Sequence, residues 1–401
     1  MSSAWRSDCP VLVTEAHTLG SLAVIRSLGR AGYQVHACSL RTDALGFFSN
    51  FCNTRVVCPS YSDPAFLDWL RDYTREHRIQ VIVPSEGFLL SIRPAFQEFS
   101  PLLPFSASES VIYAAMSKSD QFANLTRDPR STSTRNHIPP SLLLRTGEEI
   151  PAADAFEALG APLYVKVDGC YARFGGEGRV YPVSYGVQAR QLSLSLISKY
   201  ERILVQGHVP GRGVGAFFLV WDGQPLAEFM HLRLHEVPAT GGVSSYRKSW
   251  WHQGIRDDAL AKIKAMNWQG VGMMEYRWDP ATDQFHFLEM NGRFWGSLHL
   301  ALFAGVDFPT LLLDAHLGYP PCRVAGPSKE TASRYTFPRE LMYVWSRWKD
   351  AQISWPSKLG SVLEFFLLGL DPRVRSDLWF PGDRMLYWRQ LARAFRELTQ
   401  P

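Results

Sequence analysis

The chain has 401 residues, of which 46% are hydrophobic and 20% are charged. This length is enough for roughly two or three domains, and these fractions exclude a collagen, a coiled coil, a disordered chain and a disulfide-dense miniprotein. The formal net charge is +4, and the basic residues are scattered along the chain. Charge alone therefore predicts no nucleic-acid or membrane partner, and it is compatible with a small phosphate-bearing ligand.

The six cysteines show neither a C-x-x-C pair nor the spacing of a zinc knuckle. They predict reduced, mostly packed thiols and no zinc site. Residues 1–13 lack the apolar run of a signal peptide. The most apolar stretch, residues 362–370, is about half as long as a membrane-spanning helix. We therefore expect a cytoplasmic protein without membrane insertion.

Residues 8–110 alternate between short apolar runs and helix-forming segments. The predicted strands are residues 11–13, 33–39, 55–58 and 80–84, with helices at residues 22–30 and 64–77. This alternation predicts an open α/β sheet. The first turn, residues 14–20, lacks the G-x-G-x-x-G fingerprint, so a dehydrogenase built on this domain is the weaker alternative.

Residues 111–325 combine helices with a larger number of strands. A helix with Lys118 at its centre is predicted first. The later strands are expected at residues 162–167, 180–183, 202–206, 213–221, 224–231, 271–278 and 284–290. That pattern predicts an α+β domain with an antiparallel-rich sheet. Residues 326–401 carry five tryptophans among apolar and arginine positions, and we expect amphipathic helices there, with no chemistry assigned.

Two neighbouring strand-like runs each end in charged or polar groups. The turn at residues 279–283 folds the first run back on the second, which can bring Glu275 beside Glu289. Asn291 shares a face of the extended chain with Glu289, and Arg293 continues that row. Two carboxylates and an amide oxygen suit Mg²⁺ held against phosphates. The alternative is a hairpin whose charged side chains face solvent.

Three further segments carry groups that suit a nucleotide. Lys166 ends a predicted strand before a glycine-rich loop at residues 175–178, as in a phosphate clamp, and the alternative is a solvated lysine beside a flexible hairpin. The strand that ends at Gln206 breaks into Gly and Pro, which predicts unpaired backbone groups for an adenine edge. Arg233 lies in an alternating strand before a basic pair at residues 247–248, and a surface strand edge is the alternative there.

In this order, these segments resemble the ATP-grasp superfamily, and in particular its carboxylate–amine ligase branch, over residues 8–325. The resemblance implies an α/β plus α+β fold. Its parts are a Rossmann-like pre-ATP-grasp domain at residues 8–110, an ATP-grasp domain of two α+β subdomains at 111–325, and a C-terminal helical extension at 326–401.

The resemblance also implies roles for individual residues. The expected nucleotide-binding residues are Lys118 and Lys166, Gly175 and Gly176 in a small lid loop, and Gln206, Gly207 and Val209 in the adenine hinge. The expected magnesium ligands are Glu275, Glu289 and Asn291. The groups expected to face the acyl phosphate, the γ-phosphate or the substrate carboxylate are Arg293, Arg233, Arg247 and Lys248. The sequence departs from the family at Gln206, where many members carry Glu, and at Gly213, where an acid for the ribose is expected.

The implied reaction is ATP-dependent amide formation. A carboxylate attacks the γ-phosphate of Mg-ATP, and an amine captures the acyl phosphate with release of ADP and phosphate. The expected cofactors are ATP and Mg²⁺, with Mn²⁺ as a substitute, and the expected partners are small-molecule carboxylates and amines, with no nucleic acid; a homodimer is compatible with the family. The alternatives are carboxyphosphate or carbamoyl-phosphate chemistry of the same superfamily, and a non-catalytic nucleotide-binding regulator.

Overall fold

The computed structural model describes residues 4–105, 108–127, 132–173, 178–238, 242–319, 322–327 and 329–399. The chain forms two compact units, each built from segments that are far apart in sequence. Unit 1 comprises Met1–Phe105, Pro225–Trp251 and Arg293–Pro401, and unit 2 comprises Ser106–Gln224 and His252–Gly292. The three consecutive domains expected from the sequence stay a prediction.

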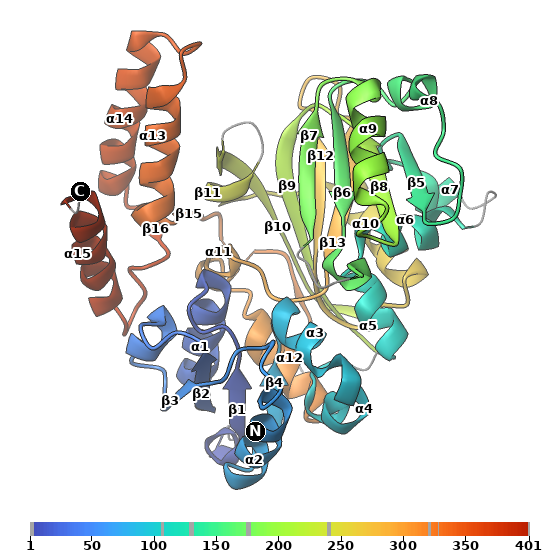
Figure 1. Ribbon diagram of the computed structural model, residues 1–401. Coiled ribbons are helices and arrows are strands. Elements are labelled where there is room, and N and C mark those ends of the chain that lie inside the picture. The colour runs from blue at the N-terminus through green and yellow to red at the C-terminus, as the bar shows by residue number, and fades with distance from the viewer. Residues whose placement is uncertain are drawn as a thin grey trace. The chain divides into compact units, whose positions relative to one another are not determined.

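A four-stranded parallel sheet forms the N-terminal part of unit 1 (Figure 1). Its strands, in the order β3-β2-β1-β4, are Thr54–Val57 (β3), Gln34–Ser39 (β2), Pro10–Val13 (β1) and Val81–Val83 (β4). The helices of this part are Leu19–Ala31 (α1), Phe66–Glu76 (α2), Glu86–Ile92 (α3) and Phe96–Phe99 (α4). Val11 and Val81 in the central strands have no exposed surface, as expected for a parallel sheet. The open α/β sheet predicted from the sequence is confirmed.

Local sequence determines where α1 begins and ends. The Thr18 side chain accepts a hydrogen bond from the Ser21 N–H at 3.2 Å, and Gly32 ends the helix with a φ of 98°. Gly20 lies in the first turn, where a Cβ would be 3.0 Å from the Trp295 carbonyl oxygen. The backbone at Trp295 therefore occupies the space that the missing Cβ of Gly20 leaves open. This packing role gives no support to a dinucleotide phosphate site at this turn.

The rest of unit 1 contains further strands and helices. The strands β10 (Gln224–Val237), β11 (Val243–Ser249), β15 (Ala332–Arg334) and β16 (Val374–Ser376) lie in this order, and β14 (Val324–Ala325) pairs with β10. The helices are α11 (Leu298–Phe303), α12 (Phe308–His316), α13 (Leu341–Lys349), α14 (Trp355–Leu370) and α15 (Met385–Thr399). The expected C-terminal helices are thus confirmed. No helix within the described ranges has the length and apolarity needed to cross a bilayer.

A fully buried ion pair fixes the C-terminal segment to α1. Arg26 Nε donates to Asp383 Oδ2 at 2.8 Å, and neither side chain has exposed surface. Arg26 Nη1 also donates to the Asp377 carbonyl at 2.6 Å, and Ser49 Oγ donates to Asp383 at 2.8 Å. Burial lowers the pKa of Arg26, and the charge of Asp383 opposes that shift. Because each charge depends on the other for compensation, losing one partner should be costly.

Unit 2 contains two sets of antiparallel strands. The first set lies in the order β5-β8-β6-β7, with bounds Ser141–Arg145 (β5), Arg202–Gly207 (β8), Leu163–Val167 (β6) and Arg179–Val183 (β7). One face packs on α8 (Ala153–Glu157) and α9 (Gly186–Leu196), where Val165, Ile203 and Phe156 have no exposed surface. In the second set, β12 (Gly270–Trp278) lies between β9 (Arg212–Trp221) and β13 (Phe285–Asn291). The remaining helices are α5 (Glu109–Ala115), α6 (Lys118–Thr126), α7 (Thr132–Arg135) and α10 (Gln253–Ala265).

All six cysteines of the chain are free thiols, and Cys9, Cys38 and Cys58 are buried. Burial raises the pKa of Cys9 to about 11. A protonated, buried thiol is unreactive, and this agrees with the packed thiols predicted from the sequence.

Candidate functional site

Lys118 is the first residue of α6. The preceding helix α5 ends at Ala115, and Ser117 caps α6 by accepting a hydrogen bond from the Asp120 N–H at 3.0 Å. The predicted helix with Lys118 at its centre is therefore wrong, because the apolar pattern continues across a break that the cap creates. At this position the Lys118 ammonium lies 3.1 Å from the Glu289 carboxylate.

Asp168, just after β6, holds the N-terminus of α6. One oxygen of its buried carboxylate accepts hydrogen bonds from Ser117 Oγ at 3.0 Å, from the Ser119 N–H at 3.0 Å and from Ser119 Oγ at 2.8 Å. The other oxygen accepts from the Lys118 N–H at 3.1 Å. A carboxylate is also favoured at the positive end of a helix dipole. Sequence reasoning missed this role of Asp168, and the available signal was the short polar run around Lys118.

Lys166 is buried on β6, two residues before Asp168. Its Nζ donates to Gln206 Oε1 on the neighbouring strand β8 at 2.6 Å. Burial lowers the pKa of Lys166 to about 8, although the Glu289 carboxylate attracts the charged form, and the charge of Lys118 adds to the lowering. An anion arriving beside this lysine would favour its charged form and raise that pKa again.

The expected metal-binding residues Glu275 and Glu289 stand directly opposite each other on β12 and β13. The pairing predicted from the hairpin is thus confirmed. Asn291 Nδ2 donates to Glu289 Oε1 at 3.1 Å. Burial alone would raise the pKa of Glu289, but the charges of Lys118 and Lys166 lower it to about 2. The alternative of a hairpin whose charged side chains face solvent does not hold for Glu289, because its side chain is only 21% exposed and is paired with Lys118.

Gln121 connects α6 to the strand that carries Glu289 and Asn291. Its Oε1 accepts from the Met290 N–H at 2.7 Å, and its Nε2 donates to the Met290 carbonyl at 2.8 Å. Because Met290 lies between the two expected ligands, this contact fixes both of them relative to α6. Sequence reasoning missed Gln121, whose partner is 169 positions away in the chain.

The oxygen donors of this cluster fit a hard divalent cation. Glu275 and Glu289 supply carboxylates and Asn291 an amide, and Mg²⁺ prefers such oxygen ligands. Glu289 is ionised at neutral pH, as a metal ligand must be. Within the part of the chain that the structure describes, no three His, Cys, Asp or Glu side chains form a metal cage. A cation here would therefore complete its shell with phosphate and water oxygens.

The backbone after β8 is already hydrogen-bonded at two positions of the expected hinge. The Gly207 N–H donates to the Pro140 carbonyl at 2.9 Å, and the His208 N–H donates to the Pro162 carbonyl at 3.0 Å. The prediction of unpaired backbone groups is wrong for these two amides. Both backbone N–H groups after the strand break are hydrogen-bonded, because the carbonyls of Pro140 and Pro162 accept from them.

Glycine is required at position 207 for packing. A Cβ there would lie 2.0 Å from the Leu159 carbonyl oxygen. Gln206 and Val209 are buried on either side of it. The role of these three residues toward adenine stays a prediction, and the expected lid glycines, Gly175 and Gly176, lie outside the described residues.

Arg233 on β10 and Arg247 on β11 stand opposite each other in unit 1. Arg233 Nη1 lies 3.3 Å from Glu236, and Arg247 is ion-paired with Asp377 in a site where neither side chain is more than 1% exposed. Two facing guanidinium groups repel each other, so each needs its own acidic partner. A guanidinium buried in such a pair serves the packing of the unit, and nothing in this geometry supports a substrate role for Arg247.

Arg293 and Lys248, the other basic residues expected to contact substrate, also lie in unit 1. Arg293 Nε is 3.4 Å from the Glu86 carboxylate, and Glu86 opens α3. Lys248 is exposed on β11. Their roles toward phosphate or carboxylate stay predictions.

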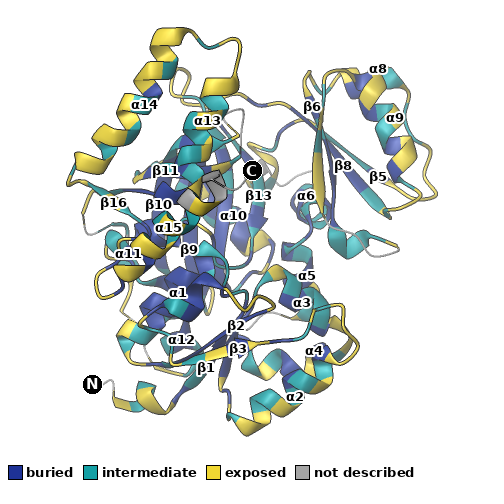
Figure 2. Cartoon of the chain, turned by 60° about the vertical axis from the view of Figure 1, so that its left-hand side comes forward, coloured by how far each residue is buried: buried dark blue, intermediate teal, exposed yellow. Residues whose placement is uncertain are grey.

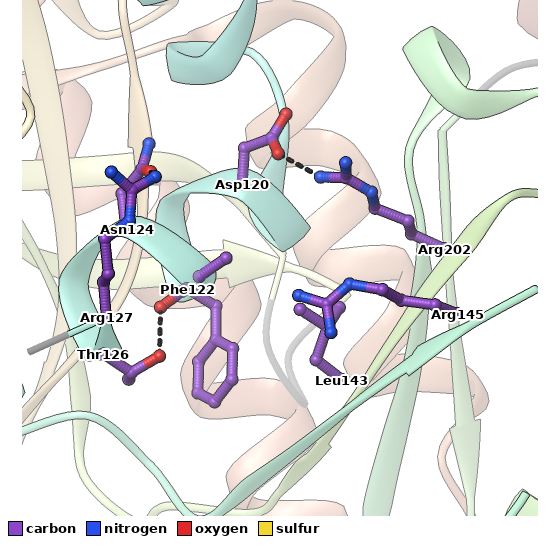
Figure 3. A pocket seen from close by; sticks show the side chains of 9 residues that line it. Asp120, Phe122, Asn124, Thr126, Arg127, Leu143, Arg145 and Arg202 are labelled. Carbon is purple, nitrogen blue, oxygen red and sulfur yellow. Dashed lines mark hydrogen bonds and ion pairs between the residues drawn. The ribbon is translucent and has the colours of Figure 1, made fainter. Parts of the chain in front are cut away.

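A cavity of about 510 Å³ lies along α6 in unit 2 (Figure 3). It is lined by Asp120, Phe122, Ala123, Asn124, Thr126, Arg127, Leu143, Arg145 and Arg202. Arg202 pairs with Asp120, which also accepts a hydrogen bond from the Tyr171 hydroxyl. None of the expected nucleotide-binding residues that the structure describes lines this cavity, so its ion pair serves to fasten α6 to β8.

No protein-family model matches the chain, and neither does any curated protein. Solved structures do resemble it, at TM-scores of 0.57 to 0.59. The L-amino acid ligase from Bacillus licheniformis is 14% identical (TM-score 0.57), and the match covers 78% of this chain and 75% of that one. A biotin carboxylase from Campylobacter jejuni is 15% identical (0.57; 77% and 71% covered), and the N5-carboxyaminoimidazole ribonucleotide synthetase from Thermus thermophilus is 15% identical (0.59; 80% and 82% covered). The parallel sheet, the two antiparallel strand sets and this likeness together show that the chain has the ATP-grasp fold.

Proposed function

We propose that this protein is an ATP-dependent carboxylate–amine ligase that forms an amide through an acyl phosphate and releases ADP and phosphate. The observation that carries the proposal is a cluster in unit 2, made of Lys118, Lys166, Glu275, Glu289 and Asn291. Ammonium groups beside ionised carboxylates suit a polyphosphate that arrives with a divalent cation.

ATP and Mg²⁺ are the proposed cofactors, with Mn²⁺ as a substitute. The biotin carboxylase that shares this fold was solved as a complex with β,γ-ATP. Glu275, Glu289 and Asn291 would hold the cation. When bound, it supplies positive charge that neutralises the phosphate oxygens during transfer.

The chain's own residues orient the reactants and stabilise charge. Lys118 and Lys166 present fixed positive charge to the phosphates, and burial strengthens the effect of Lys166. In the proposed reaction a substrate carboxylate oxygen attacks the γ-phosphorus and ADP leaves. The amine nitrogen then attacks the acyl carbon, phosphate leaves, and the amine gives up a proton to solvent. Arg293, Arg233 and Lys248 are the candidates for contacts with the substrate carboxylate.

Carboxyphosphate chemistry is the second candidate, because two structural relatives carry the names of carboxylating enzymes, a biotin carboxylase and an N5-carboxyaminoimidazole ribonucleotide synthetase. The two candidates differ in the acid that triggers ATP cleavage. A ligase needs an organic carboxylate together with an amine, whereas a carboxylase needs bicarbonate. ADP release measured with each acid therefore separates them.

The test is ADP release by the purified chain with ATP, Mg²⁺, and pooled carboxylic acids and amines. We expect sustained release over many turnovers only when both pools are present, because without an amine the acyl phosphate is not consumed. Glu289→Gln should lower the rate on the order of a hundredfold, since a lost electrostatic contact of this kind costs about 3 kcal/mol. The matched control is Glu148→Gln, whose carboxylate is 55% exposed and pairs with Arg145 at 3.5 Å. Release driven by bicarbonate alone would favour the carboxylase, and full activity in Glu289→Gln would contradict both.

A further inference from the structure

Helix α14 in unit 1 exposes a continuous apolar face. Six of its side chains are between 54% and 80% exposed: Trp355, Leu359, Leu363, Phe366, Leu367 and Leu370. At about 100° per residue, these positions fall within roughly a third of the helix circumference. We call this face the α14 stripe. Figure 2 shows α14 coloured as exposed along most of its length.

The opposite side of α14 is already occupied. Phe365 packs against a core cluster that contains Phe337 and Leu378, and Ser361 is buried. Glu364, outside the stripe, lies 3.5 Å from His235 on β10. The helix is therefore anchored to unit 1 by one side, and the stripe is the side that the anchoring leaves outward.

The stripe has the spacing of a helix-packing seam. Leu359, Leu363, Phe366 and Leu370 follow one another at intervals of four, three and four residues, the pattern by which two helices interlock their side chains. The two charged residues of α14, Lys358 and Glu364, both fall outside it. A seam without charge can pack against an identical seam without repulsion.

The area of the stripe is also that of an interface. Side chains of this size and exposure present roughly 700 Å² of apolar surface. The largest apolar patch of a typical monomer is about 300–600 Å², and a standard interface takes about 800 Å² from each partner. Trp348 on α13, whose ring centre is 5.4 Å from that of Trp355, extends the same surface.

We propose that the α14 stripe is the contact between two copies of this chain, related by a two-fold axis. A two-fold contact requires a self-complementary surface, and an uncharged seam of regular spacing provides one. A lipid surface is the other occupant to consider, because helices at a lipid interface often carry tryptophan together with lysine or arginine. Such a pair is present on α13, where the Lys349 ammonium lies 4.8 Å from the centre of the Trp345 ring. Helices that lie in a lipid interface carry a charged face opposite the apolar one, whereas the opposite face of α14 packs on protein.

Sedimentation equilibrium of the whole chain tests the proposal. At tens of micromolar we expect a mass near twice 45.4 kDa. The double variant Leu363→Glu with Phe366→Glu should dissociate, with its dissociation constant raised at least a hundredfold. The matched control is Ser357→Glu, an exposed position of α14 outside the stripe, which should remain a dimer. A cooperative thermal unfolding transition in each variant shows that it is folded, and the unfolding temperature of the dissociated variant should lie below that of the wild type because it lacks the stabilisation of the dimer.

Cross-linking gives a second readout that needs no destabilising charge. A two-fold axis through the stripe brings its middle residue, Leu363, close to its own copy. With the exposed Cys322 replaced by Ser, Leu363→Cys should form a covalent dimer on oxidation, and Gln352→Cys in the exposed loop before α14 should not. A wild-type monomer at every concentration, or a dimer that survives the double variant, would overturn the proposal. So would a monomer whose stripe binds phosphatidylcholine–phosphatidylserine vesicles.

Discussion

Asp168 is the residue on which the position of the first lysine depends. In Asp168→Asn, one of the two carboxylate oxygens becomes an NH₂ group. That group would face the N–H or hydroxyl donors of Ser117, Lys118 and Ser119, which the wild-type carboxylate satisfies. A donor facing a donor is repulsive, so the N-terminus of α6 should loosen and Lys118 should lose its fixed position.

The size of the effect follows from these contacts. Leaving one buried backbone donor unsatisfied costs about 1–3 kcal/mol, and the lost charge at the helix N-terminus adds about 0.5 kcal/mol. We therefore expect a destabilisation of about 2 kcal/mol. For a unit of this size that corresponds to a fall in the unfolding temperature of roughly 4–8 °C. Nucleotide affinity should fall on the order of tenfold, as one misplaced charge contact implies.

Differential scanning calorimetry and nucleotide titration calorimetry measure these two quantities. The matched control is Asp154→Asn, an exposed acid in the first turn of α8 whose carboxylate accepts a hydrogen bond from Ala155. It should leave the nucleotide affinity unchanged and lower the unfolding temperature by no more than about 1–2 °C, the effect of one exposed charge at a helix N-terminus. An Asp168→Asn variant with the unfolding temperature and affinity of the wild type would refute the positioning argument. Loss of affinity without loss of stability would instead assign Asp168 a direct contact with the nucleotide.

Three further predictions concern single residues. Nucleotide binding should weaken as the pH rises, because Lys166, with a pKa of about 8 in the free protein, is charged below that pH and neutral above it. About one pH unit above the pKa, only a tenth of the Lys166 side chains are charged. Titration calorimetry there should show a nucleotide affinity that is roughly tenfold weaker. Gly207→Ala should lower the unfolding temperature, because its Cβ would lie 2.0 Å from the Leu159 carbonyl oxygen and such overpacking costs about 1–3 kcal/mol. Asp383→Asn should cost about 3 kcal/mol in urea unfolding, because Arg26 stays buried with its charge uncompensated.

Each of these has an outcome that would contradict it. A nucleotide affinity that is constant across alkaline pH would show that the charge of Lys166 does not contribute to binding. Wild-type stability in Gly207→Ala would mean that the strand break can move away from its neighbour. An Asp383→Asn variant with unchanged urea midpoint would show that the buried pair does not hold the C-terminal segment.

The hairpin of the candidate site could be predicted because its signals are local. Alternating apolar residues predict both strands, and a turn rich in Asp and Pro joins them. Two strands joined in this way have a restricted set of registers, so the juxtaposition of Glu275 and Glu289 followed from the sequence and is confirmed. The position of Lys166 on strand β6 could be predicted for the same reason.

The start of α6 and the hydrogen bonding of the hinge could not be predicted from the sequence, because residues distant in sequence determine them. Lys118 opens a helix rather than lying within one, since its cap is held by Asp168, about 50 positions later. After Gln206, the N–H groups of the next two residues donate hydrogen bonds to the carbonyls of prolines in two other segments of the chain. The assignment of chain segments to the two units also depends on distant residues, since no local pattern shows that β10 and β11 fall in the same compact unit as residues 1–105.

The nucleotide proposed for unit 2 would bind with a divalent cation between its phosphates and the oxygens of Glu275, Glu289 and Asn291. The most direct measurement is a crystal structure of the chain with Mn²⁺ and a non-hydrolysable ATP analogue, in which anomalous scattering locates the metal. We expect a manganese peak about 2–2.5 Å from oxygens of these three side chains, with phosphates beside Lys118 and Lys166. A nucleotide bound elsewhere, or manganese held away from all three residues, would contradict it.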